Sequence, residues 1–116
     1  MSISTNNLWG LDKDSSIKAI LLLLQHEVNP GSFMLLDKEK LNIKAVRLIS
    51  SKNPNEVSAY IYSYAQRKER YGLDLEFPFL IETSADDQSI RMDDLTAEGV
   101  VKKVIEHLEL KRTAAT

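Results

Sequence analysis

Cysteine is absent from this 116-residue chain, and histidine, proline and glycine are scarce, which excludes several kinds of site. Without cysteine the chain has no disulfide framework, no thiolate metal site and no cysteine nucleophile. Its two histidines, His26 and His107, lie far apart in the sequence and belong to no His-Glu-x-x-His pattern. Its four glycines form neither a phosphate-binding loop nor a dinucleotide fingerprint. We therefore expect no metal, no cofactor and no catalytic residue, and predict that the protein is not an enzyme.

Long apolar runs are missing as well. The longest, residues 20–24, is far shorter than the roughly 20 residues that cross a bilayer. No basic stretch precedes an apolar segment near the N-terminus, as it would in a secretory signal. We therefore expect a cytoplasmic protein with no membrane partner, which also suits the lack of cysteine. With 43% hydrophobic residues, the chain is expected to form one domain over 1–116, in which about 1–12 and 112–116 are loosely ordered termini.

Charge is unevenly distributed along the chain, although the net charge is only −2. Residues 37–72 contain eight lysines and arginines against four acids, a net charge of +4. Residues 73–98 contain one arginine against eight acids, a net charge of −7. This asymmetry indicates either two oppositely charged surfaces that suit a charged partner, or two ordinary solvated faces.

Periodicity and capping residues predict four helices, over about 15–28, 38–50, 54–71 and 97–110. The first and last have an apolar face and a side chain that can cap the helix start, namely Asp14 or Ser15 in the first and Thr96 in the last. A strand over 43–49 is the alternative for the second, since β-branched residues suit both. Short strands are predicted at 33–36, 73–82 and 89–92, the last two as a hairpin around a polar turn.

The helix over 54–71 is predicted from the signals at its two ends. The run Asn53-Pro54-Asn55-Glu56 offers a capping side chain, a proline at the first helical position and a carboxylate near the start. Gly72 suits the left-handed residue that ends many helices. If the segment formed a strand instead, three tyrosines at alternate positions would share one face: Tyr60, Tyr62 and Tyr64.

The predicted fold is therefore α+β, with about four helices and a small antiparallel sheet of two or three strands. The order of these elements resembles that of winged-helix domains. In those domains the third helix reads a nucleic-acid groove and the hairpin forms the wing. The resemblance is limited to the order of the elements, and function does not follow from fold.

The outward face of the predicted helix over 54–71 is the main candidate for a binding surface. We expect a non-catalytic binding or regulatory module that contacts an unidentified protein, or a second copy of the chain, through Tyr62, Arg67 and Arg70. The alternative is a winged-helix-like nucleic-acid-binding protein, in which the same helix presents amides, hydroxyls and cations: Asn55, Ser58, Gln66, Arg67, Lys68 and Arg70. A polar face that only keeps the domain soluble explains the same residues.

The acidic pair Asp86-Asp87 bears on the choice between these alternatives. In the expected wing it would repel phosphates, which favours a protein partner over nucleic acid. A small enzyme with an acidic site around this pair is a third alternative, for which the sequence contains no further signal.

Overall fold

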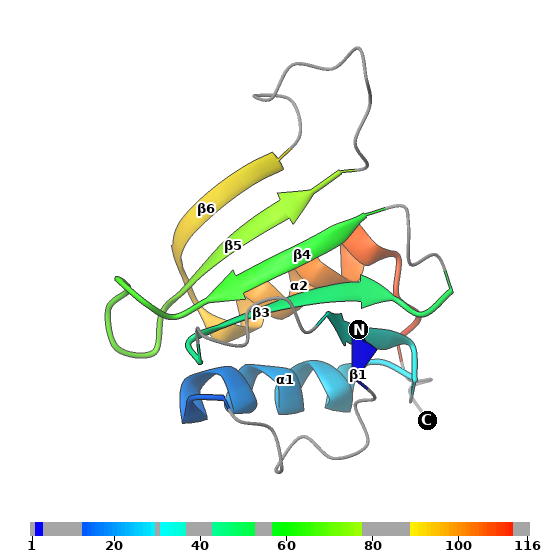
Figure 1. Cartoon of the computed structure of the whole chain (residues 1–116), viewed down its shortest axis with the longest axis horizontal. Helices are drawn as coiled ribbons and strands as arrows, with labels where there is room; N and C mark the ends of the chain where they lie inside the picture. Colours follow the sequence, from blue (N-terminus) through cyan, green and yellow to red (C-terminus); the bar gives the residue numbers. More distant parts are fainter. Residues whose placement is uncertain are drawn as a thin grey trace.

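The computed structural model describes residues 2–3, 13–29, 31–36, 43–52, 57–77 and 89–112, which form two helices and one antiparallel sheet (Figure 1). The helices are α1 (Ser15–Glu27) and α2 (Ala97–Leu108). The strands are β1 (Ser2–Ile3), β2 (Phe33–Leu36), β3 (Ala45–Ser50), β4 (Ser58–Tyr62), β5 (Tyr71–Glu76) and β6 (Ser89–Leu95). They lie in the sheet in chain order, each antiparallel to the next, so β1 and β6 are its outer strands within the described ranges.

Both helices begin at the capping residues that the sequence predicts. Asp14 Oδ2 accepts the backbone N–H of Ser16 at 3.0 Å at the start of α1. Thr96 Oγ1 accepts the backbone N–H of Gly99 at 3.1 Å at the start of α2. The predictions of the first and last helix are therefore confirmed.

The two helices and one face of the sheet form the main hydrophobic core. In Figure 1, α2 runs behind the central strands, and α1 lies below β3 in the same view. The strands contribute every second residue to this core, because successive side chains point to opposite faces of a sheet. Leu48 of β3, Ile61 of β4 and Leu73 of β5 are fully buried there, together with Ile20 of α1 and Val104 of α2.

The segment 54–71 is not a helix, so the prediction of about four helices with a two- or three-stranded, winged-helix-like sheet is wrong. Residues 58–62 form β4, residues 63–70 form a loop, and β5 begins at Tyr71. Residues 59–62 are all buried, because β4 is a central strand with both faces covered. Continuous burial removes the alternation typical of a strand, and the apolar spacing then suits a helix equally well. The predicted capping run at 53–56 lies outside the described residues.

The prediction of a second helix over 38–50 is also wrong, because its later part forms a buried strand. Ala45–Ser50 form β3, which corresponds to the alternative strand over 43–49. Every residue of β3 except Arg47 is buried, so this strand also lacks an alternating pattern.

Three strand predictions agree with the structure. β2 occupies the predicted 33–36, and β5 pairs with β6 as the predicted hairpin requires. Residues 78–88, which include Pro78 and the acidic pair Asp86-Asp87, lie outside the described residues.

Candidate functional site

The face of the sheet that points away from the main core carries a layer of tyrosines. Tyr60 and Tyr62 of β4 pack there with Ala45 of β3 and with Tyr64, and neither helix contributes to this cluster in the described ranges. The ring centroids of Tyr60 and Tyr62 lie 5.7 Å apart, and those of Tyr62 and Tyr64 lie 4.7 Å apart in a stacked arrangement. The three tyrosines therefore share one face, as the strand alternative predicts.

Arginine–carboxylate pairs from neighbouring strands flank these tyrosines. Arg91 of β6 donates to both carboxylate oxygens of Asp74 of β5, at 3.0 and 2.9 Å, and these hydrogen bonds raise the pKa of Arg91. Arg47 of β3 donates to both carboxylate oxygens of Glu76, at 2.7 and 2.9 Å. Each guanidinium also lies over a tyrosine ring, at 4.8 Å for Arg47 and 5.4 Å for Arg91.

Ion pairs in the fold connect the basic segment of the sequence with its acidic segment. The basic and acidic segments lie side by side in the fold, where Arg47 pairs with Glu76 at 2.7 Å and Arg67 pairs with Asp94 at 2.7 Å. Opposite charges from the two segments therefore neutralise each other across neighbouring elements, instead of all remaining for two separate charged surfaces.

Tyr62, which the sequence places at an interface, has only 3% of its surface exposed. Its hydroxyl donates to Asp93 Oδ1 at 2.7 Å. Burial, followed by this hydrogen bond, raises the pKa of Tyr62. The ring lies over Gly72, its partner on β5, where any Cβ atom would overlap the ring. Tyr62 therefore packs inside the protein and does not offer its ring to a partner.

Side-chain hydrogen bonds attach the β4–β5 loop (residues 63–70) to the end of β6. Gln66 Nε2 donates to Asp93 Oδ1 at 3.1 Å, and Gln66 Oε1 accepts the backbone N–H of Asp94 at 2.9 Å. Arg67 donates to both carboxylate oxygens of Asp94 at 3.0 and 2.7 Å, and this contact lowers the pKa of Asp94. Arg70 donates to the backbone carbonyl of Asp94 at 3.3 Å. Three residues predicted to form a binding site thus come together at one place.

Three residues of this region have a left-handed backbone conformation, which is unfavourable for residues other than glycine. Ala65, Glu69 and Asp94 have φ values of 56°, 63° and 60°, which lie in the left-handed region. Residues with a Cβ adopt this region at a cost in free energy. The hydrogen bonds around Asp94 therefore hold the loop in one conformation that its sequence alone would not favour.

A groove of about 930 Å³ lies between this loop and the N-terminal ends of both helices. Arg67, Lys68 and Arg70 line it from the loop, and we call it the basic groove. Ser15 of α1 and Thr96, the cap of α2, line it from the helices. Helix N-termini carry a partial positive charge, so they add to the potential of the three cations. Two acids also line the groove, Glu69 and Glu98.

Ser58 and Gln66, two further residues of the predicted nucleic-acid set, do not line the groove. Ser58 lies on β4, and its hydroxyl donates to Glu76 Oε1 at 2.8 Å. Asn55 lies outside the described residues. Lys68 is exposed and makes no ion pair within the described part of the chain. In the structure, Gln66, Arg67 and Arg70 all contact Asp94, and Lys68 lies on the same loop.

Sequence reasoning misses three residues that shape this region: Arg91, Asp93 and Asp94. Their only signal is position, since Arg91 is the single cation among the acids of 73–98 and the two aspartates directly precede Leu95 and the predicted helix. The partners of the aspartates lie 24 to 31 residues away in the chain, so only the fold brings them together.

Neither histidine belongs to a metal site in the described ranges, which contain no group of three or more histidine, aspartate or glutamate residues able to hold an ion. His107 Nε2 lies 3.0 Å from the carbonyl oxygen of Ser58 and 2.9 Å from that of Glu76. This histidine therefore connects α2 to the ends of β4 and β5.

Comparison with protein-family models, with curated proteins and with solved structures finds no match to this chain. In the ranges that the structure describes, neither helix combines the length and the apolar character needed to traverse a bilayer.

Proposed function

We propose that the protein is a non-catalytic binding module that acts through protein–protein contact, with the basic groove as its docking site for an acidic segment of the partner. The observation that carries this proposal is the placement of Arg67, Lys68 and Arg70 along one groove between two helix N-termini. An acidic segment would meet three cations and two favourable helix dipoles there, which outweigh the opposing charges of Glu69 and Glu98.

The attachment of the β4–β5 loop supports this role. Gln66, Arg67 and Arg70 all bind the end of β6, so the loop does not have to become ordered when a partner arrives. Binding to a preformed surface avoids the entropic cost of ordering a flexible one.

The charges within the groove identify the residue that is best suited to a test. Arg67 shares its charge with Asp94, whereas Lys68 makes no ion pair among the described residues. Lys68 is therefore available to a partner carboxylate at no loss to the fold. The nucleic-acid function predicted from a helix over 54–71 is not proposed again, because this segment forms a strand, a loop and the start of β5.

Fluorescence anisotropy with a labelled peptide rich in aspartate and glutamate tests the proposal. The wild-type protein should bind this peptide with an affinity that decreases as salt is added. The charge reversal Lys68→Glu should weaken binding by about tenfold or more, corresponding to about 1.4 kcal/mol.

Lys102→Glu is the matched control, because Lys102 is an exposed lysine of α2 that does not line the basic groove. It should bind the peptide within about twofold of the wild type, as a distant surface charge changes little. Equal losses in the two variants, or no binding at low salt, would contradict the proposal. Tighter binding of labelled duplex DNA than of the peptide would replace the protein partner with nucleic acid.

A further inference from the structure

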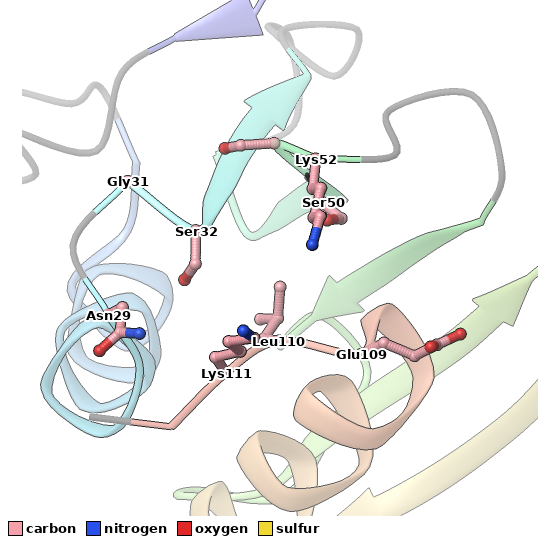
Figure 2. A pocket seen from close by; sticks show the side chains of 9 residues that line it. Asn29, Gly31, Ser32, Ser50, Lys52, Glu109, Leu110 and Lys111 are labelled. Atoms are coloured by element: carbon pink, nitrogen blue, oxygen red, sulfur yellow. Dashed lines mark hydrogen bonds between the residues drawn. The ribbon is translucent and has the colours of Figure 1, made fainter. Parts of the chain in front are cut away.

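We propose that a second hollow, at the opposite ends of the two helices from the basic groove, binds a phosphate group, either as free phosphate or as a small phosphomonoester. The hollow has a volume of about 360 Å³ and lies where three segments meet (Figure 2). These segments are the turn before β2, the end of β3 and the residues that follow α2. We call it the serine hollow, after Ser32, Ser50 and Ser51 in its lining.

Backbone hydrogen bonds join the three segments, so the serine hollow is a fixed part of the fold. The N–H of Ser51 donates to the carbonyl of Ser32 at 3.0 Å, which connects the end of β3 to the turn. The N–H of Asn29 donates to the carbonyl of Lys111 at 3.0 Å, which connects the turn to the residues after α2.

Two hydroxyl groups in this lining are buried without a hydrogen-bond partner among the residues that the structure describes. They are the Oγ atoms of Ser32 and Ser51. Ser50 differs from them, because its Oγ accepts the backbone N–H of Lys52 at 3.2 Å. A buried polar group without a partner is unfavourable in a folded protein and is found at sites that receive a ligand or an ordered water. A serine O–H bond can turn about its C–O bond to donate to a bound group.

The two lysines around the hollow favour an anion and oppose the partial negative charge that the C-terminal ends of α1 and α2 place beside it. Lys52 and Lys111 line it, and neither makes an ion pair within the described residues. Figure 2 shows the Lys52 and Ser32 side chains reaching into the space between the three segments. Among the lining residues that the structure describes, the one carboxylate belongs to Glu109, whose side chain points away from this space in the same view.

The donors match a phosphate group. Its oxygens accept hydrogen bonds from hydroxyls, an amide and ammonium groups at once, and serine, Asn29 and the two lysines supply these donors. Small-molecule sites usually have volumes of about 300 to 1,000 Å³, so the hollow has room for a phosphate and a small organic part. A phosphomonoester and free phosphate share the same recognition chemistry.

Thermal unfolding of the full chain with inorganic phosphate, with glycerol 3-phosphate, or with sodium chloride of equal ionic strength tests the proposal. Both phosphate compounds should raise the Tm in a saturable manner, as expected for a ligand that binds only the folded state, and chloride should not. Isothermal titration calorimetry gives the two affinities. Tighter binding of glycerol 3-phosphate assigns the site to a phosphomonoester, and equal or weaker binding assigns it to free phosphate.

The variants Ser32→Ala and Lys52→Gln complete the test. Ser32→Ala should leave the Tm without phosphate unchanged or higher, because its hydroxyl has no partner, and should weaken phosphate binding about tenfold. Lys52→Gln should weaken binding by a similar factor, whereas the control Lys103→Gln, an exposed lysine of α2 outside the hollow, should not. The absence of binding to the wild type, or identical Tm shifts in all variants, would overturn the proposal.

Discussion

Gly72 and Tyr62 face each other across β4 and β5, and their contact shows how one residue restricts its neighbour. The tyrosine ring lies so close to the glycine that a Cβ atom at position 72 would overlap it. The small residue predicted to end a helix is instead required in a strand, where it makes room for an aromatic ring.

Replacement of this glycine gives the first prediction. Gly72→Ala should lower the free energy of unfolding by about 1 to 3 kcal/mol, because an added methyl group in a packed site forces side chains from their preferred positions. Urea unfolding measures this change. In a Tyr62→Ala background, where the ring is absent, the same substitution should cost much less. An equal cost in both backgrounds would contradict the role of the ring.

Ionisation of Tyr62 gives a second prediction at the same scale. Burial and the hydrogen bond to Asp93 raise its pKa in the folded state above the ordinary value of 10.0. The stability contributed by the protonated hydroxyl is therefore complete below about pH 10 and is lost as the pH rises toward the higher folded pKa. The urea midpoint should fall as the pH rises above about 10. Tyr62→Phe should make this fall less steep, and an unchanged slope would contradict the prediction.

At the scale of elements, the β4–β5 loop depends on a strand that is distant in the sequence. Its residues Ala65 and Glu69 adopt left-handed conformations, and Gln66 compensates by bridging to both Asp93 and Asp94. Gln66 and the two aspartates are 27 and 28 residues apart in the chain, so local sequence patterns do not predict their contact. The loop and β6 therefore stabilise each other, and the basic groove depends on both.

Removal of the bridge should loosen the loop without unfolding the protein. In Gln66→Ala, two hydrogen bonds of about 1 kcal/mol each are lost, so amide hydrogen exchange at residues 65–70 should become at least about tenfold faster. Exchange in α1 should remain close to that of the wild type. Unchanged loop exchange would contradict this role of Gln66 and leave the contacts of Arg67 and Arg70 with Asp94 to maintain the loop.

At the scale of the whole molecule, the sheet is covered in two different ways. The helices cover one face with an apolar core, and the other face carries tyrosines with arginine–carboxylate pairs from β3, β5 and β6. Apolar burial is the main source of stability, and ion pairs of limited burial contribute less.

This difference predicts unequal effects of substitution. Leu73→Ala, at a fully buried position on the helix-covered face, should cost about 2 to 5 kcal/mol through lost burial and the cavity left behind. Lys103→Ala, on the exposed side of α2, should change stability by no more than about 0.5 kcal/mol. Both values are measured by chemical denaturation. A cost below about 1 kcal/mol for Leu73→Ala would contradict this location of the main core.

Local sequence patterns predict the helices of this protein better than its central strands. α1 and α2 are amphipathic and capped, with Asp14 and Thr96 at their starts, so local patterns are sufficient to predict them. β3 and β4 are buried on both faces, and neither has the alternation that would separate a strand from a helix. The choice between the two structures at 45–50 and 58–62 depends on neighbouring strands that local patterns do not reveal.

The sequence by itself determined the two outer helices, their caps, β2 and the β5–β6 hairpin, whereas it put Gln66, Arg67, Lys68 and Arg70 on the polar face of a helix that the described residues do not form. Only the tertiary structure decided that these residues stand on a loop, that Tyr62 is buried against Gly72, and that Asp94 receives Arg67 and Arg70. The physical reason is the range of the interactions. Caps and helical faces are formed by residues within a few positions of one another, whereas strand pairing and ion pairs join residues tens of positions apart.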